Sequence, residues 1–197
     1  MTNIIPYLPG SLTVEETYNA CVNICNKYAQ NNISSVSVLD YEEITPAVDS
    51  ITPLSYIIVY LPLPFVLTNA PHISGHLIAI YHDGNDIILF DSAHTLDLLT
   101  LYPNLSLLSE SFRFQTDHRI QRASSQKCGN YVVFNLFCVV QNLNINDFFA
   151  YKHHSTIQYF EDCEATISFF TFKYRIGEEW DPQNSMHFPN LQSLSCL

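Results

Sequence analysis

Polar and apolar positions along the chain predict an early helix followed by several short strands. A capping-box-like start at Thr13-Val-Glu-Glu precedes apolar positions at helical spacing, so we expect a helix over about 13–31. Runs rich in β-branched and aromatic residues each favour a strand, and they occupy residues 36–39, 55–60, 76–81 and 86–90. Asp83 and Gly84 form a turn signal, so the last two runs are expected to make a hairpin.

The second half of the chain predicts further strands and more helices. Residues 93–109 are rich in Leu and interrupted by Pro103, which favours short helical turns. From Cys128 to about Leu143 the chain is apolar nearly all round, which is typical of a buried helix. The remaining expected elements are strands over 112–114 and 118–121 and helices over 146–153 and 156–174. A helix, a mixed sheet of about five strands and then more helices indicate the α+β class.

The length and composition fit one folded domain. A chain of 197 residues, 47% hydrophobic and 14% charged, is expected to bury a sizeable core. We place the domain at residues 1–176 and a C-terminal tail or strap at 177–197, where polar residues and two prolines gather. No apolar run reaches the roughly 18 residues of a membrane span, and the N-terminus lacks the pattern of a secretory signal. A reducing compartment with free thiols is therefore expected.

Charge and cysteine spacing narrow the classes of partner and site. The net charge is −11 and Lys and Arg together number eight, so nucleic-acid binding through bulk electrostatics is not expected. Cys21 and Cys25 share a helix face, but two thiols cannot form a tetrahedral zinc site alone, so no metal is expected. A cluster of basic residues within 113–127 can bind an acidic peptide or, as we favour, belong to a solvated loop. It consists of Arg113, His118, Arg119, Arg122 and Lys127.

Cys128 stands where a polar loop ends and the apolar helix begins. A cysteine at this place lies at the positive end of the helix dipole, which favours the thiolate. Composition alone would favour a buried structural cysteine, but the polar loop and the preceding Gln121 favour a nucleophile. The Gln121 amide can donate to an oxyanion, with the backbone N–H of Cys128 as second donor. Gln126 is too close to Cys128 to swing over the thiol, and Cys138 belongs to the expected core.

His76 opens one strand of the expected hairpin, and Asp91 follows the other. The first residue of a strand lies across from the last residue of its antiparallel partner, so the two side chains can meet. His76 would then act as general base, and Asp91 would orient its imidazole. The alternatives in this region are His72, His82 and His94 for the base and Asp86 for the orienting residue. Cys, His, Asp and Gln together are the parts of a cysteine protease.

The order His76, Asp91, Gln121, Cys128 and two segments, GHLIAIYHDGNDIILFDS and IQRASSQKCGNY, resemble the adenovirus maturation protease family. Its relatives include eukaryotic proteases that process ubiquitin-like modifiers and proteases of large self-synthesising DNA transposons. The resemblance covers roughly residues 54–143. A Trp usually follows the histidine in the family, and this chain has Leu77 instead. The resemblance implies a papain-like cysteine protease fold, in which a central helix carries the nucleophile against the sheet.

The resemblance implies a cysteine endopeptidase that acts on viral or mobile-element structural precursors during particle maturation. Relatives cleave after small residues, so we expect a scissile bond near glycine, with Gly75, Leu77 and Gly129 at the substrate site. A glycine such as Gly129 allows close approach of a backbone. Two alternatives stay open. One is an isopeptidase that removes ubiquitin or SUMO, and the other is a catalytically silent homologue with a structural or interaction role, against which the complete set of site residues argues.

The resemblance also bears on cofactors, partners and location. Adenovirus proteases use a disulfide-linked activating peptide and viral DNA. The cysteine that holds the peptide does not map onto this chain, so no cofactor is expected. An activating peptide stays open as an alternative, and the acidic charge argues against activation by DNA. The expected partner is a protein substrate, either a capsid or precursor polyprotein or a ubiquitin-like modifier. The expected location is the nucleus or cytoplasm of a host cell, or the virion.

Overall fold

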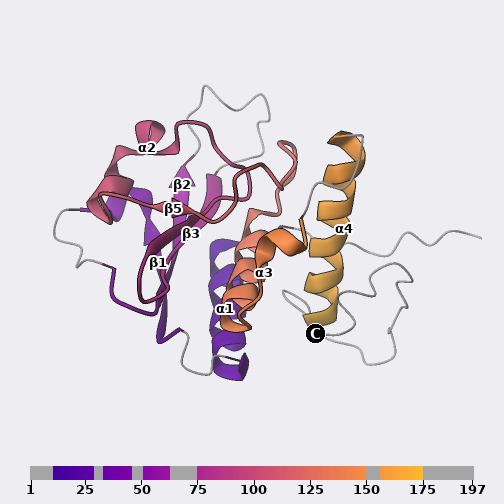
Figure 1. Cartoon of the computed structure of the whole chain (residues 1–197), viewed down its shortest axis with the longest axis horizontal. Coiled ribbons are helices and arrows are strands. Elements are labelled where there is room, and N and C mark those ends of the chain that lie inside the picture. Colours follow the sequence, from indigo (N-terminus) through magenta and orange to yellow (C-terminus); the bar gives the residue numbers. More distant parts are fainter. Residues whose placement is uncertain (1–10, 29–32, 46–50, 63–74, 150–155, 175–197) are drawn as a thin grey trace, which may run out of the picture.

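A computed structural model describes residues 11–28, 33–45, 51–62, 75–149 and 156–174 (Figure 1). These residues form an α+β fold around a mixed five-stranded sheet of order β1-β2-β3-β4-β5. The strands are β1 (Ser35–Asp40), β2 (Ser55–Pro62), β3 (Gly75–His82), β4 (Ile87–Phe90) and β5 (Arg113–Phe114). β1 and β2 run parallel, as do β4 and β5, whereas the β2–β3 and β3–β4 pairs are antiparallel. The predicted α+β class and mixed sheet are confirmed.

The helices begin close to where the sequence predicts them. They are α1 (Val14–Tyr28), α2 (Leu98–Leu101), α3 (Cys128–Val140) and α4 (Thr156–Tyr174), with 3₁₀ turns at Tyr41–Glu43, Pro103–Leu107 and Ile145–Asp147. The predicted capping box starts α1, because the Thr13 N–H donates to Glu16 Oε2 (2.7 Å) and the Glu16 N–H donates to Thr13 Oγ1 (3.1 Å). None of the described helices combines the length and apolar character needed to cross a membrane.

The central strands β2, β3 and β4 are buried on both faces, to which successive side chains of a strand point in turn. Tyr56 and Ile58 of β2 belong to a core that includes residues of α1 and α3, whereas the neighbouring Ile57 and Val59 pack with residues of the α2 region. Figure 1 shows α1 and α3 beside the sheet and α4 beyond α3. Helix α3 is therefore surrounded by the sheet, α1 and α4.

Nearly every residue of α3 is buried, as its apolar sequence predicts. Cys128 and Val139 are the partly exposed ones. A polar anchor ties this helix to the sheet, since the Tyr56 hydroxyl lies 2.9 Å from both the Val132 carbonyl oxygen and Asn135 Oδ1. A buried, hydrogen-bonded helix of this kind gives the residue at its N-terminus a fixed position.

Two predicted elements differ in the structure. Residues 118–121 form a loop rather than a strand, because the backbone N–H groups of Ile120 and Gln121 both donate to the Ser92 carbonyl oxygen instead of entering a ladder. The helix predicted over 146–153 does not form in residues 146–149, where the structure has the 3₁₀ turn Ile145–Asp147 instead. Residues 150–153 lie outside the described part of the chain. The expected boundary between residues 176 and 177 also lies outside it.

Candidate active site

His76 and Asp91 form a buried hydrogen-bonded pair. His76 lies near the start of β3, and Asp91 directly follows β4. The β3–β4 ladder ends with the pair Ala79 and Phe90, so Asp91 emerges beside the first part of β3. His76 Nε2 lies 2.7 Å from Asp91 Oδ1, and the side chains are only 9% and 2% exposed. The hairpin therefore brings together the two residues that the sequence predicts as base and orienting group.

The Asp91 carboxylate is held by the loop that follows it. Oδ1 accepts from the Ala93 N–H (2.9 Å) and Oδ2 from the Thr95 N–H (2.7 Å). His94 between them has φ of 45°, a left-handed conformation that folds the chain back around the carboxylate. Burial alone would raise the pKa of Asp91, but the hydrogen bond and charge of His76, with the Thr95 N–H, hold it well below its usual range. Asp91 is thus a fixed anion.

Cys128 is the first residue of α3 and forms a hydrogen bond with His76. Since Asp91 occupies Nε2, the ring nitrogen left for the thiol is Nδ1. Burial would raise the pKa of Cys128, but the hydrogen bond and charge of His76, together with the backbone N–H groups of Leu77 and Gly129, lower it. For His76, burial would lower the pKa, but the hydrogen bonds to Asp91 and Cys128 raise it to about 10. Both shifts favour a thiolate–imidazolium pair.

The other described cysteines behave in the opposite way. Burial raises the pKa of Cys25 to about 11 and that of Cys163 to about 12, and it raises those of Cys21 and Cys138 as well. Cys128 is therefore the one cysteine among the described residues whose surroundings favour the reactive anion. This agrees with its interpretation as a nucleophile and with that of Cys138 as a core residue.

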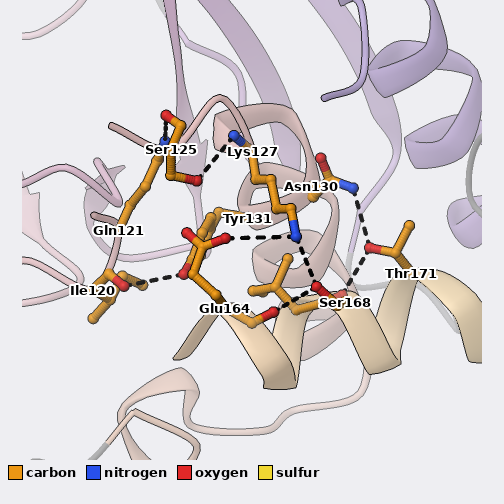
Figure 2. Close-up of polar contacts among 10 residues, drawn as sticks. Ile120, Gln121, Ser125, Lys127, Asn130, Tyr131, Glu164, Ser168 and Thr171 are labelled. Carbon is orange, nitrogen blue, oxygen red and sulfur yellow. Dashed lines mark hydrogen bonds and ion pairs between the residues drawn. The ribbon is translucent and has the colours of Figure 1, made fainter. Parts of the chain in front are cut away.

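Gln121 lies in the loop that leads to α3, with its side chain buried. Its Oε1 accepts from the Ser92 hydroxyl (2.6 Å), and its Nε2 donates to the Ser125 carbonyl oxygen (2.8 Å; Figure 2). Its backbone N–H donates to the Ser92 carbonyl oxygen (2.8 Å). The Nε2 group has two hydrogens, so one remains after the bond to Ser125. Gln121 thus has a fixed amide in the segment that ends at Cys128.

The competing residues within the described part of the chain lie elsewhere or make other contacts. Gln126 is exposed, unlike Gln121. His82 Nδ1 accepts from the Gly84 N–H (2.9 Å) at the hairpin turn, and Asp86 pairs there with Arg113 (3.3 Å). His94 lies in the loop that wraps Asp91, and His72 is outside the described residues. Among the alternatives that the structure describes, the geometry therefore supports His76 and Asp91.

The three residues expected at the substrate site have close neighbours within the chain. A Cβ atom on Gly75 would lie 2.1 Å from Cε2 of Tyr60, and one on Gly129 would lie 2.4 Å from Oγ1 of Thr17. Leu77, at the position where the related family has Trp, is 4% exposed and packs in the core shared with α3. Packing inside the fold thus explains the small size of both glycines, and contact with a substrate stays a prediction.

Helix α4 holds the start of α3 from the side away from the sheet. Figure 2 shows the Lys127 side chain running to α4, where Nζ donates to Ser168 Oγ (2.8 Å) and lies 3.6 Å from Glu164 Oε2. One turn along α3, Asn130 Nδ2 donates to Thr171 Oγ1 (3.1 Å). Sequence reasoning missed these contacts and the role of Ser92. Only Ser92 had a local signal, its position directly after Asp91.

The basic cluster is compensated by nearby acceptors. Arg113 pairs with Asp83 (3.3 Å), Arg122 with Glu161 (3.9 Å) and His118 with Asp117 (2.5 Å), in addition to the Lys127–Glu164 pair. Arg119 Nε donates to the Ala93 carbonyl oxygen (2.7 Å). These contacts fit the interpretation as a solvated loop, and binding of an acidic peptide stays a prediction.

Within the described residues, no group of three or more His, Cys, Asp and Glu side chains is placed to hold a metal ion. The chemistry that this arrangement can perform is nucleophilic attack by an ionised thiol, with proton transfer through His76 and hydrogen-bond donors beside the sulfur. A comparison of the chain with models of protein families gave no match, and a comparison with curated proteins gave none either.

Proposed function

We propose that this protein is a cysteine endopeptidase with the triad Cys128, His76 and Asp91. The observation that carries the proposal is the buried chain of hydrogen bonds from the Asp91 carboxylate through His76 to the thiol at the start of α3. A structural cysteine needs neither a lowered pKa nor a buried histidine oriented by a carboxylate. Perturbed pKa values in a geometric arrangement of this kind are typical of functional sites.

In the proposed reaction the Cys128 thiolate attacks the carbonyl carbon of a peptide bond, which forms a sulfur–carbon bond and an oxyanion. Gln121 Nε2 and the backbone N–H of Cys128 donate to that oxyanion. The His76 imidazolium gives its proton to the leaving nitrogen, the carbon–nitrogen bond breaks, and a thioester remains. A water molecule then attacks the thioester while His76 takes its proton. The sulfur–carbon bond then breaks, which releases the carboxylic acid and regenerates the thiolate.

The substrate and the finer fold class rest on the resemblance to adenovirus maturation proteases. The mixed sheet with the nucleophile at the start of a buried helix is compatible with a papain-like fold. We propose cleavage near glycine in structural precursors of a virus or mobile element, within the host cell or the particle. The two segments that carry the resemblance, residues 75–92 and 120–131, support this proposal. Both lie in the described part of the chain.

A thiol-directed peptide aldehyde or vinyl sulfone that ends in Gly-Gly tests the proposal. Mass spectrometry should find the probe on Cys128, with labelling lost in Cys128→Ala and strongly reduced in His76→Ala. Cys138→Ala is the matched control, because Cys138 lies in the same helix and is buried, so this variant should label normally. A folded protein that leaves Cys128 unlabelled, or labels it equally without His76, contradicts the proposal and favours a scaffold role.

A further inference from the structure

Ser92 connects the two halves of the candidate site. It directly follows Asp91, which orients His76, and its own side chain is fully buried. The Ser92 hydroxyl donates to Gln121 Oε1 (2.6 Å), and the Ser92 carbonyl oxygen accepts from the N–H groups of Ile120 (3.0 Å) and Gln121 (2.8 Å). One residue therefore makes three hydrogen bonds to the loop that carries the oxyanion donor.

These bonds decide which end of the Gln121 amide is available. Only the Nε2 end can donate to an oxyanion, since Oε1 is an acceptor. With the amide as it stands, Oε1 receives the Ser92 hydroxyl and Nε2 faces the Ser125 carbonyl oxygen (2.8 Å; Figure 2). A flipped amide would place Oε1 against that carbonyl, two acceptors without a hydrogen between them. The Ser125 carbonyl oxygen thus fixes which end of the amide is the donor, and the Ser92 hydroxyl anchors the other end.

We propose that Ser92 is a positioning residue for the oxyanion donor, an inference that rests on the proposed peptidase function. The consecutive residues Asp91 and Ser92 then align the base and the donor from one short segment. Removing the Ser92 hydroxyl leaves Gln121 Oε1 buried without this donor and loosens the amide, which the Ser125 carbonyl oxygen then holds at its Nε2 end alone. Since loss of an entire oxyanion donor costs about 10²–10³ in kcat, a loosened donor should lower kcat by about tenfold.

The test compares two reactions of the same thiol. Hydrolysis of a glycine-containing peptide passes through an oxyanion, whereas alkylation by iodoacetamide displaces iodide from carbon and forms none. Ser92→Ala should lower kcat about tenfold with little change in KM, while the alkylation rate of Cys128 stays within about twofold of wild type. Ser92→Thr keeps the hydroxyl and should retain most of the activity. Ser55→Ala is the control, because Ser55 is also buried and its hydroxyl donates only to the Thr52 carbonyl oxygen (2.6 Å) away from the site.

A double-variant comparison separates positioning from a general structural effect. In a Gln121→Ala background, Ser92→Ala should cause no further loss of kcat, since its partner is already gone. An unchanged kcat in Ser92→Ala, slower alkylation, or an additional loss beside Gln121→Ala would overturn the proposal. Failure of the peptidase function itself is distinguishable, because wild-type protein would then hydrolyse no peptide and His76→Ala would leave alkylation of Cys128 unchanged.

Discussion

His76 Nε2 and Asp91 Oδ1 lie 2.7 Å apart in surroundings from which water is almost excluded. In such surroundings a paired charge is strongly stabilised by its partner, and an unpaired one is costly. The backbone N–H groups of Ala93 and Thr95 donate to the Asp91 carboxylate and keep it in place even though it is buried. The state of the thiol at Cys128 therefore depends on a residue that does not touch it.

Asp91→Asn should lower the activity of the enzyme while the fold is kept. The amide has the size of the carboxylate but no charge, so the His76 imidazolium loses its stabilising partner and its tautomer is no longer fixed. A loss of kcat of about 10²–10⁴-fold is expected by analogy with other triads. Peptide hydrolysis measures it. Asp86→Asn, at the far end of the same hairpin, is the control and should keep activity near wild type.

The pH dependence of Cys128 alkylation should reveal the lowered pKa. Because the contacts with His76 place this pKa below the ordinary value of 9.0, the thiolate should be present and reactive at pH values where a free thiol is protonated. Replacing His76 with Ala removes the largest stabilising contact, so the midpoint of the rate profile should move to higher pH. A profile that is the same with and without His76 would show that the two side chains are not coupled.

Sequence patterns predicted the parts of this fold that depend on local signals. The apolar run after Cys128 and the Thr13 capping box set the starts of α3 and α1, and the segment 156–174 forms α4 with the expected bounds. His76 and Asp91 could be paired from the sequence because a hairpin with a clear turn signal connects them.

Features that depend on distant contacts could not be predicted in this way. The sequence predicts a strand over residues 118–121, yet the N–H groups of Ile120 and Gln121 bind Ser92, which lies far away in the sequence. The contact between Lys127 and Ser168 likewise depends on where α4 packs, and neither residue has a distinctive local pattern. Tertiary hydrogen bonds thus decide the conformation of the segment that carries Gln121.

The stability of the protein in acid should depend on Asp91. Its pKa in the folded state lies below the ordinary value of 3.8, so on acidification the unfolded chain binds the proton first. The stabilisation is therefore complete above about pH 5 and is lost as the pH falls below 3.8 toward the folded value. Urea unfolding of wild type and Asp91→Asn between pH 6 and 3 should show a difference in free energy of unfolding that shrinks at the acidic end. A difference that stays constant to pH 3 would contradict the lowered pKa.

The contact between Lys127 and α4 should matter for stability and for catalysis together. Lys127 immediately precedes Cys128, and its side chain and that of Glu164 are only 16% and 21% exposed. Lys127→Met removes the cation that lies beside Glu164 Oε2. The other carboxylate oxygen, Oε1, is buried and already has no hydrogen-bond partner among the described residues. We expect a loss of about 1–3 kcal/mol in the free energy of unfolding and a lower kcat, because the start of α3 is no longer held. Urea unfolding and peptide hydrolysis measure the two effects.

Arg113→Met gives the matched control for Lys127→Met. Arg113 is a single cation in ion pairs with Asp83 and Asp86, but its side chain is 58% exposed, so its loss should cost no more than about 1 kcal/mol and leave kcat unchanged. Adding Glu164→Leu to Lys127→Met removes the unpaired carboxylate and should recover part of the lost stability. It should not recover kcat, because the methionine side chain cannot make the hydrogen bond that Lys127 Nζ donates to Ser168. If both cation variants behave alike, α4 does not hold the nucleophile in place.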